Sequence, residues 1–163
     1  MALRKRADGI LTIEQTRDWA AVGGLLSRAG MIAYGIESPA ACYIVAYEGS
    51  RAVGVIGLET KVTVALVRSL FVLDRFRHRG IATKLLAAAR KAAHTRGARE
   101  LYLLSSEGAA LWKRMGYAQV PVADLLLRLD GVPQLEYYKS RPEELAREVA
   151  WRLDISRDGV IDR

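Results

Sequence analysis

A short basic turn joins a strand-like run to an Ala-rich helical run in the middle of the chain, and this junction constrains the fold most strongly. Residues 70–73 are apolar, as in a buried strand, whereas residues 81–96 carry apolar side chains at helical spacing. The turn between them is rich in arginine and ends at Gly80. Residues 100–104 are predicted to form a strand directly after the helix. Strand, helix and strand in this order predict a right-handed crossover, with the two strands locally parallel.

The other periodic segments complete an α+β (mixed α/β) domain with a mixed sheet and helices on both faces. The three strand-like runs that end at this junction should form an antiparallel meander, and residues 133–142 are expected to be an irregular connection. The chain shows no second domain, so residues 1–163 are expected to form one domain, with residues 1–8 as a flexible basic N-terminus. Predicted strands cover residues 9–14, 41–47, 51–59, 62–73, 100–104 and 149–155, and predicted helices cover a segment capped by Thr16 that continues to Leu26, then 81–96, 109–115 and 122–129.

The net charge of +7 favours an anionic ligand or partner. Nucleic acid is one candidate and a polyphosphate cofactor is another. The arginines are scattered, and the sequence shows no zinc-finger spacing, no aromatic-basic RNA motif and no heptad repeat. We therefore do not expect a nucleic-acid partner.

Several classes of protein are disfavoured by what the sequence lacks. No apolar run approaches the about 20 residues that a membrane span needs, and no apolar signal-peptide stretch follows the basic start, so we expect a cytoplasmic protein without membrane contact. Cys42 is the only cysteine and lies in an apolar strand-like run, so it is interpreted as a buried core thiol. One cysteine excludes an intrachain disulfide and argues against a cysteine-based zinc site, and we expect no metal.

The turn before the helix has the chemistry of a pyrophosphate cradle. A helix N-terminus carries unpaired N–H donors and a partial positive charge, which together bind phosphate. Gly80 lets a ligand approach the backbone closely, Ala82 is small, and Arg77 and Arg79 add positive charge. The segment lacks the Gly-Lys-Ser/Thr ending of a nucleotide P-loop and the three spaced glycines of a dinucleotide fingerprint. Charge alone would fit a basic turn into an amphipathic helix equally well.

The pattern Arg77-x-x-Gly80-x-Ala82 resembles the R/Q-x-x-G-x-G/A signature of the GNAT (Gcn5-related N-acetyltransferase) superfamily. The strand at residues 70–74 and the Leu-Trp-Lys-Arg-Met-Gly-Tyr segment at 111–117 are similar to the family's neighbouring segments, and the element order agrees from about residue 9 to residue 120. Residues 57–59, 66–70 and 101–106 also resemble an amino-acid N-acetyltransferase subgroup found in arsenic-resistance operons, which is similar to the acetyltransferase part of N-acetylglutamate synthase. The resemblance does not extend well beyond residue 131.

The resemblance implies a GNAT-type fold and acetyl-CoA as co-substrate. In that fold the sheet is mostly antiparallel and is splayed at one parallel strand pair, and acetyl-CoA lies in the gap. The Val72 amide would donate to the thioester carbonyl and to the oxyanion that forms from it. Lys84 would add charge near the phosphates, or it lies on a solvated helix face. The cofactor-binding residues implied are Phe71, Val72 and Leu73 for the pantetheine arm, Arg77, His78, Arg79, Gly80, Ile81, Ala82 and Thr83 for the pyrophosphate, and Ser106.

The resemblance also suggests roles for two charged residues. The amine must lose a proton before it attacks, and Glu59 is the candidate base, with Glu107 as an alternative. An exposed turn residue is an equal interpretation of Glu59. Arg68 lies in an otherwise apolar strand, where a charge is costly unless it is paired, so it is a candidate for binding a substrate carboxylate. An outward-facing strand arginine is the competing interpretation.

The sequence departs from the family at Trp112. A tyrosine often occupies this position and protonates the departing CoA thiolate, which an indole cannot do. Tyr102, Tyr117 and Ser106 are candidate substitutes, and water is another. The leading hypothesis is therefore an N-acetyltransferase acting on a small amino-acid-like primary amine. The alternative is a catalytically weak acyl-CoA-binding sensor or regulatory module, and a homodimer is allowed.

Overall fold

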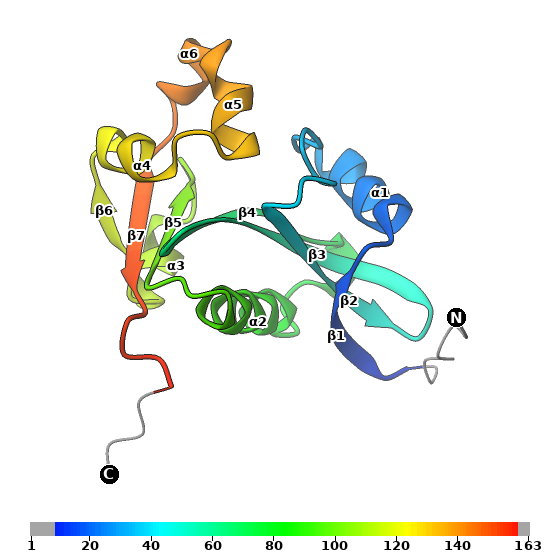
Figure 1. The fold of residues 1–163 in the computed structure, drawn as a ribbon. Helices are drawn as coiled ribbons and strands as arrows, with labels where there is room; N and C mark the ends of the chain where they lie inside the picture. The colour runs from blue at the N-terminus through cyan, green and yellow to red at the C-terminus, as the bar shows by residue number, and fades with distance from the viewer. Residues whose placement is uncertain (1–8, 160–163) are drawn as a thin grey trace.

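The structure, a computed structural model, describes residues 9–159 and contains a seven-stranded sheet in the order β1-β2-β3-β4-β5-β7-β6 (Figure 1). The predicted segment 1–8 lies outside the described residues. The strands are β1 (Leu11–Thr16), β2 (Ala41–Glu48), β3 (Arg51–Lys61), β4 (Val64–Val72), β5 (Glu100–Leu104), β6 (Ala118–Val120) and β7 (Ala150–Asp154). The helices are α1 (Trp19–Ala29), α2 (Ile81–Thr95), α3 (Ala109–Arg114), α4 (Val122–Leu129), α5 (Pro133–Lys139) and α6 (Pro142–Leu145), with a 3₁₀ turn, η1, at Asp74–Phe76.

The strand pairing confirms the predicted mixed sheet. Strands β1 to β4 pair antiparallel in sequence order. Short turns join β2 to β3 and β3 to β4, whereas α1 lies between β1 and β2. Helix α2 then carries the chain across the sheet, and β5 pairs with β4 in parallel. Strand β7 returns antiparallel beside β5, and β6 pairs with the other edge of β7.

Strands β4 and β5 stay together for only part of their length. The parallel register runs from Val64 opposite Glu100 to Val67 opposite Leu103, yet β4 continues to Val72. Beyond Val67, β4 therefore follows β3 alone and separates from β5. This is the predicted splay at the one parallel pair.

The helices cover both faces of the sheet (Figure 1). Helix α2 lies on one face, and its buried residues, such as Leu85 and Ala89, pack into the main core. Helices α1, α4 and α5 lie on the other face, at opposite ends of the sheet. A second apolar cluster joins α4 and α5 to β4, β5 and β7 through Leu125, Leu135 and Leu66.

Three local predictions from the sequence were wrong. Residues 133–142 were expected to be irregular, but they contain α5, because Pro133 occupies the first helical turn, where its fixed φ favours a helix. Strand β6 was not predicted, because three residues carry too little pattern. Helix α1 is capped by Asp18, whose Oδ1 accepts from the Ala21 N–H at 3.0 Å, and Thr16 instead accepts from the Asp18 N–H.

Within residues 9–159, none of the helices is long and apolar enough to cross a membrane. The same residues contain no group of three or more His, Cys, Asp or Glu side chains placed to hold a metal ion.

Candidate functional site

The splay between β4 and β5 opens a small pocket of about 140 Å³. Its lining comes from both strands, from the segment after α1 and from α3. An indole, two serine residues and several aliphatic side chains therefore surround a space next to unpaired strand backbone. The lining residues are Met31, Val67, Arg68, Ser69, Leu70, Leu103, Leu104, Ser105 and Trp112.

A β-bulge in β4 creates the wall of this pocket. The register with β3 shifts between the Val55 and Gly57 positions, and Ser69 takes a left-handed conformation with φ of 61°. A positive φ is uncommon for a residue with a side chain, and such strain collects at functional sites. The bulge turns β4 so that residues after Ser69 still pair with β3 while their other edge is free.

The Val72 backbone faces the gap, as the resemblance implied. Leu73 donates its N–H to the Val53 carbonyl of β3 at 2.9 Å. Hydrogen-bonded and non-hydrogen-bonded pairs alternate along an antiparallel ladder. The next pair, Val72 opposite Gly54, is therefore non-hydrogen-bonded, and the N–H and C=O of Val72 point away from β3. The Val72 carbonyl accepts from Arg77 Nε at 3.1 Å, which confirms that this edge is the outer one. The Val72 N–H therefore points into the splay and the Leu73 N–H does not.

The basic turn leads from this edge to the N-terminus of α2. Gly80 is the N-cap, with φ of 74°, and a Cβ built there would meet nothing within 4 Å. No side chain caps the helix in the described residues, and its first intrahelical bond is from the Lys84 N–H to the Gly80 carbonyl. The amides of Ile81, Ala82 and Thr83 thus lack a helical acceptor. They are free to bind an anion, and the anion site itself stays a prediction; the Ile81 side chain is buried in the core.

A second cavity, of about 500 Å³, lies beside this turn and is strongly basic. Arg28 from α1, Arg51 from β3 and Arg75 and Arg77 from the turn all line it, with Asp74 as the one acidic lining residue. The Arg77 guanidinium lies 3.1 Å from Asp74 and packs over the Phe71 ring. This cavity can accommodate a polyanion beside the basic turn.

The side chains of Arg79 and His78, also in the basic turn, do not line the basic cavity. Arg79 lies 3.7 Å from Glu48 and packs over Phe76, so its charge is partly neutralised. His78 is exposed and has φ of 61°. Arg79 and His78 would therefore contribute backbone amides, rather than side chains, to the predicted pyrophosphate site.

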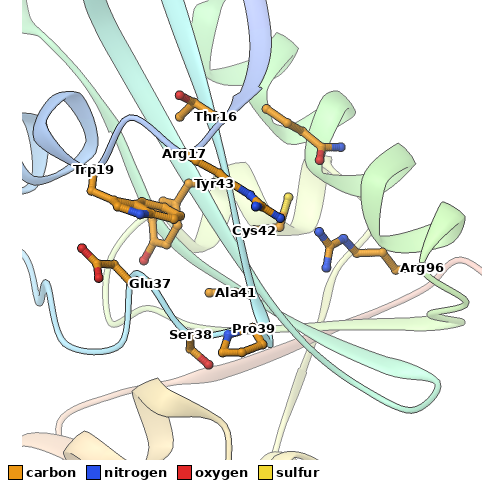
Figure 2. A pocket seen from close by; sticks show the side chains of 11 residues that line it. Thr16, Arg17, Trp19, Glu37, Ser38, Pro39, Ala41, Cys42, Tyr43 and Arg96 are labelled. Atoms are coloured by element: carbon orange, nitrogen blue, oxygen red, sulfur yellow. The ribbon is translucent and has the colours of Figure 1, made fainter. Parts of the chain in front are cut away.

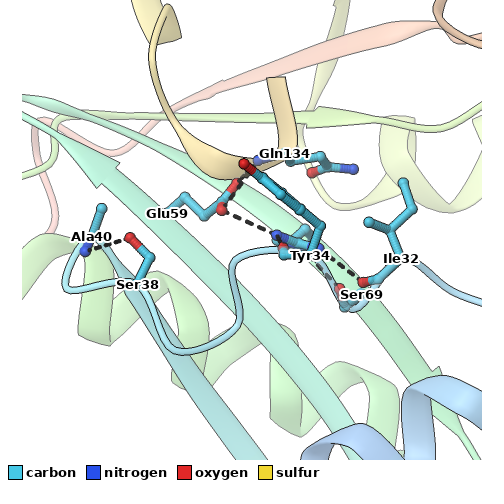
Figure 3. A network of polar contacts seen from close by, with 8 residues as sticks. Ile32, Tyr34, Ser38, Ala40, Glu59, Ser69 and Gln134 are labelled. Carbon is cyan, nitrogen blue, oxygen red and sulfur yellow. Dashed lines mark hydrogen bonds and ion pairs between the residues drawn. The ribbon is translucent and has the colours of Figure 1, made fainter. Parts of the chain in front are cut away.

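Glu59 and Arg68 are brought together into one buried ion pair (Figure 3). The Arg68 Nη1 lies 3.0 Å from Glu59 Oε2, and the two side chains are 1% and 0% exposed. Arg68 also donates from Nη1 to the Tyr34 carbonyl at 3.0 Å and from Nη2 to the Ile32 carbonyl at 2.8 Å. Glu59 accepts from the Gln134 N–H at 2.9 Å.

This pair holds a cover over the sheet, which we call the roof and define as residues 32–39 together with α5. Arg68 binds two carbonyls of the first roof segment, and Glu59 binds the first turn of α5. The two segments also touch directly, because the rings of Tyr34 and Tyr137 lie 6.4 Å apart. A Cβ on Gly35 would lie 2.3 Å from Pro133 Cβ.

The roles predicted for Glu59, as the base, and for Arg68, as the group that binds a substrate carboxylate, stay predictions. Burial raises the pKa of Glu59, against the opposing effects of Arg68 and the Gln134 amide, which is the direction expected of a base. The Glu59 carboxylate, however, does not line the pocket, whereas Arg68 does. Four of the five Arg68 donor positions are already bonded, to Ser69, Tyr34, Glu59 and Ile32.

None of Tyr102, Tyr117 and Ser106, the predicted substitutes for a tyrosine acid, lines the 140 Å³ pocket. Trp112 lines the pocket but donates its Nε1–H to the Glu107 carbonyl at 3.0 Å. The Tyr102 hydroxyl bonds Glu100 at the start of β5, and burial raises the pKa of Tyr117. Ser106 and the Glu107 side chain are exposed just after β5.

A larger cavity, of about 590 Å³, lies elsewhere, at the end of β1 (Figure 2). Trp19 and Tyr43 line one side of it, and Arg17 and Arg96 extend toward its other side, where Cys42 lies. Cys42 is buried as predicted, and burial raises the pKa of its thiol while Arg96 opposes this. This cavity does not meet the splay, so size alone does not identify the site.

Residues 39–119 match the family model described as an acetyltransferase (GNAT) domain. No curated protein matches the chain in sequence. The match covers the strands β2 to β6, the basic turn and α2. It therefore includes the splay, the bulge and the N-terminus of α2, but neither α1 nor the roof helix α5.

Solved structures similar to this chain include an acetyltransferase of the GNAT family and proteins that bind coenzyme A. N-acetylglutamate synthase from Neisseria gonorrhoeae, solved with coenzyme A and N-acetyl-glutamate, is 15% identical with a TM-score of 0.68, over 91% of this chain and 36% of that chain. A GNAT-family acetyltransferase from Staphylococcus aureus Mu50 is 14% identical with a TM-score of 0.65, over 90% and 99%. A Mycobacterium tuberculosis protein solved with CoA is 15% identical with a TM-score of 0.66, over 88% and 98%. This chain thus spans about a third of the length of the Neisseria enzyme, and the GNAT-type α+β fold is shown.

Proposed function

We propose that the chain carries a GNAT acetyltransferase domain and moves an acetyl group from acetyl-CoA to a primary amine. The observation that carries the proposal is that one basic turn joins the Val72 N–H in the splay to the uncapped N-terminus of α2. One donor suits a thioester oxyanion and the other a pyrophosphate, and these are the two anionic centres of reacting acetyl-CoA.

The cofactor would run from the pocket to the basic cavity. Its pantetheine arm would follow the free edge of β4 at Phe71 and Val72, because that edge has no partner strand. Its pyrophosphate would accept bonds from the amides of residues 79–83, and Arg77 would supply charge. Solved GNAT-type structures that hold coenzyme A support this use of acyl-CoA.

For the acceptor, we propose a small amine of amino-acid type. The pocket is small, and Arg68, which lines it and is paired with Glu59, has one donor position left for an acceptor carboxylate. The Neisseria structure with N-acetyl-glutamate is similar in fold and so is consistent with such an acceptor. The narrower arsenic-resistance subgroup stays a prediction, as do the cytoplasmic location and a homodimer.

The proposal is tested by measuring CoA release from acetyl-CoA with a panel of amino acids, polyamines and peptides. We expect release above the background hydrolysis rate with at least one amine, and an N-acetylated product by mass spectrometry. A preference for amino acids over polyamines would support the amino-acid acceptor, and the reverse preference would contradict it.

The alternative, a weak acyl-CoA-binding sensor, has one observation in its favour. Trp112 replaces the family tyrosine, and its N–H is committed to the Glu107 carbonyl. Tight acetyl-CoA binding by calorimetry with no amine-dependent CoA release would favour the sensor. Absence of both binding and release would contradict the two functions together.

A further inference from the structure

Ser69 lines the pocket, but none of the roles proposed above involves it. It lies at the bulge where β4 leaves β5, and it lines the 140 Å³ pocket together with Trp112. Its φ of 61° is a strained conformation for a serine. Strain of this kind persists only where the surrounding structure enforces it, so the fold fixes where this hydroxyl lies.

The Ser69 hydroxyl is the end of a hydrogen-bonded chain. Arg68 Nε donates to Ser69 Oγ at 3.2 Å, and the Arg68 Nη1 in turn lies 3.0 Å from buried Glu59. Because the guanidinium cannot accept a hydrogen bond, the serine proton must point elsewhere. The nearby positive charge also stabilises any negative charge that develops on the serine oxygen.

The other polar hydrogens around the pocket are already committed. Ser105 Oγ donates to the Glu107 carbonyl at 2.7 Å, and the Trp112 indole donates to the same carbonyl. The Tyr43 hydroxyl is buried beside Arg68 and Ser69, and a side-chain hydrogen bond with Ser69 is one of the effects that lower the pKa of Tyr43 against the larger effect of burial. Of the two serines that line the pocket, Ser105 donates to a backbone carbonyl, whereas Ser69 has the Tyr43 hydroxyl beside it as a group that can accept its proton.

We propose that Ser69 is a catalytic residue that relays a proton from the attacking nitrogen to the departing sulfur. The inference rests on the proposed acetyl transfer. Attack of the neutral amine on the thioester carbon forms the C–N bond and leaves the nitrogen positively charged. When the C–S bond breaks, its electron pair goes to sulfur. Ser69 gives its proton to that sulfur and takes one from the nitrogen, so CoA leaves as a thiol, the amide is neutral and the hydroxyl is regenerated.

In this arrangement Arg68 and Glu59 are positioning residues. Arg68 orients the serine oxygen, and Glu59 fixes Arg68 from the far side, so neither needs to touch the amine. The relay also fills the role that Trp112 cannot perform, because an indole N–H does not act as an acid at neutral pH. Its contribution should therefore resemble that of a general acid or base, about 10²-fold or more in rate.

The test compares Ser69→Ala, Ser69→Gly and Ser69→Cys by steady-state CoA release with the best amine of the panel. We expect kcat to fall about 10²-fold in both the Ala and the Gly variants, and less in the Cys variant, which retains an exchangeable proton. Acetyl-CoA affinity by calorimetry should stay within about twofold, because the hydroxyl acts on the reacting atoms. Ser156→Ala, in the turn after β7 at the other end of β5, is the matched control and should retain wild-type kcat.

A purely structural role for Ser69 predicts a different order of kcat among the three variants. Glycine relieves the strain of a positive φ, so the Gly variant should then equal or exceed the wild type while the Ala variant matches it. That order of kcat, or an unchanged kcat in Ser69→Ala, would overturn the proton relay. The proposed acetyl transfer would still stand, because the wild-type protein would be active. If the wild-type protein releases no CoA with any amine, the proposed function fails, and the relay with it.

Discussion

Glu59 and Arg68 come from neighbouring strands, nine positions apart in sequence, and their charged groups meet at 3.0 Å with almost no exposure to solvent. The contact follows from register, because Gly57 lies opposite Arg68 and Glu59 lies opposite Leu66, which places both side chains on the same face of the sheet. Moving two charges out of water is costly, and only close geometry and further hydrogen bonds offset that cost. Both partners have such bonds, to Ile32, Tyr34 and Gln134.

The first prediction concerns the stability that this pair contributes. Removing one partner leaves the other charge buried and unpaired, so Glu59→Leu and Arg68→Met should each lower the free energy of unfolding by about 3–5 kcal/mol. The double variant Glu59→Leu/Arg68→Met replaces the pair with apolar groups and should cost less than the sum of the single variants. Urea unfolding of the four proteins measures the coupling. Strict additivity would show that the contact contributes no coupling energy.

The second prediction separates a positioning role for Glu59 from the base role suggested by the family resemblance. Glu59→Gln retains the shape and an acceptor oxygen, so Arg68 should stay in place and kcat should fall less than in Ser69→Ala. The acidic limb of the pH–kcat profile should remain. If instead kcat falls about 10²-fold and the acidic limb disappears, Glu59 is the base. Circular dichroism of the variant checks that it is folded.

The sequence sufficed to predict features that depend on local chemistry. The basic turn, Gly80 and the helix predicted at 81–96, which the structure has at Ile81–Thr95, could be predicted because a few adjacent residues specify them. The parallel pair of β4 and β5 followed from the order strand, helix, strand. These features need no knowledge of distant contacts.

The ion pair and the serine could not be predicted in the same way. The Glu59–Arg68 contact depends on the register of two strands, and the bulge at Ser69 changes the register only beyond Arg68. The amide that caps Glu59 comes from Gln134, which lies 75 positions away in a segment expected to be irregular. The one available signal was two opposite charges within otherwise apolar strands, since buried charges are normally paired.

The third prediction tests the anion site at α2. Gly80→Glu places a negative charge where the pyrophosphate would bind, and acetyl-CoA affinity by calorimetry should fall at least tenfold, about 1.4 kcal/mol. Gly97→Glu is the matched control, because it also has positive φ and an open Cβ position but lies at the other end of α2. It should suffer similar backbone strain and retain affinity. Equal affinities for both variants and the wild type would place the cofactor elsewhere.

The fourth prediction concerns pH and Glu100. Hydrogen bonding from Arg152, reinforced by Tyr102 and Arg128, lowers the pKa of Glu100. A carboxylate with a lowered pKa in the folded state contributes stability above its unfolded pKa of about 4.3, and that contribution disappears as pH falls through the folded value. In Glu100→Gln, the free energy of unfolding should therefore decline less between about pH 5 and pH 3 than in the wild type. Exposed Glu143 on α6 is the control, and Glu143→Gln should follow the wild-type curve.

The fifth prediction tests whether the roof depends on close contact between its two segments. Gly35 has φ of 74°, and a Cβ there would lie 2.3 Å from Pro133 Cβ, in the first turn of α5. Gly35→Ala should push α5 away from the sheet and weaken the bond from the Gln134 N–H to Glu59. We expect the free energy of unfolding to fall by about 1–3 kcal/mol more than the cost of positive φ alone.

Gly30→Ala isolates that backbone cost. Gly30 also has positive φ, of 63°, but a Cβ there would meet nothing within 4 Å. Its substitution should therefore cost only the about 1–2 kcal/mol of a left-handed alanine. Hydrogen exchange at the Gln134 amide gives the local measurement, because this N–H is protected by Glu59. Exchange should accelerate in Gly35→Ala and stay unchanged in Gly30→Ala, whereas equal exchange in both variants would show that the roof tolerates separation of its two segments.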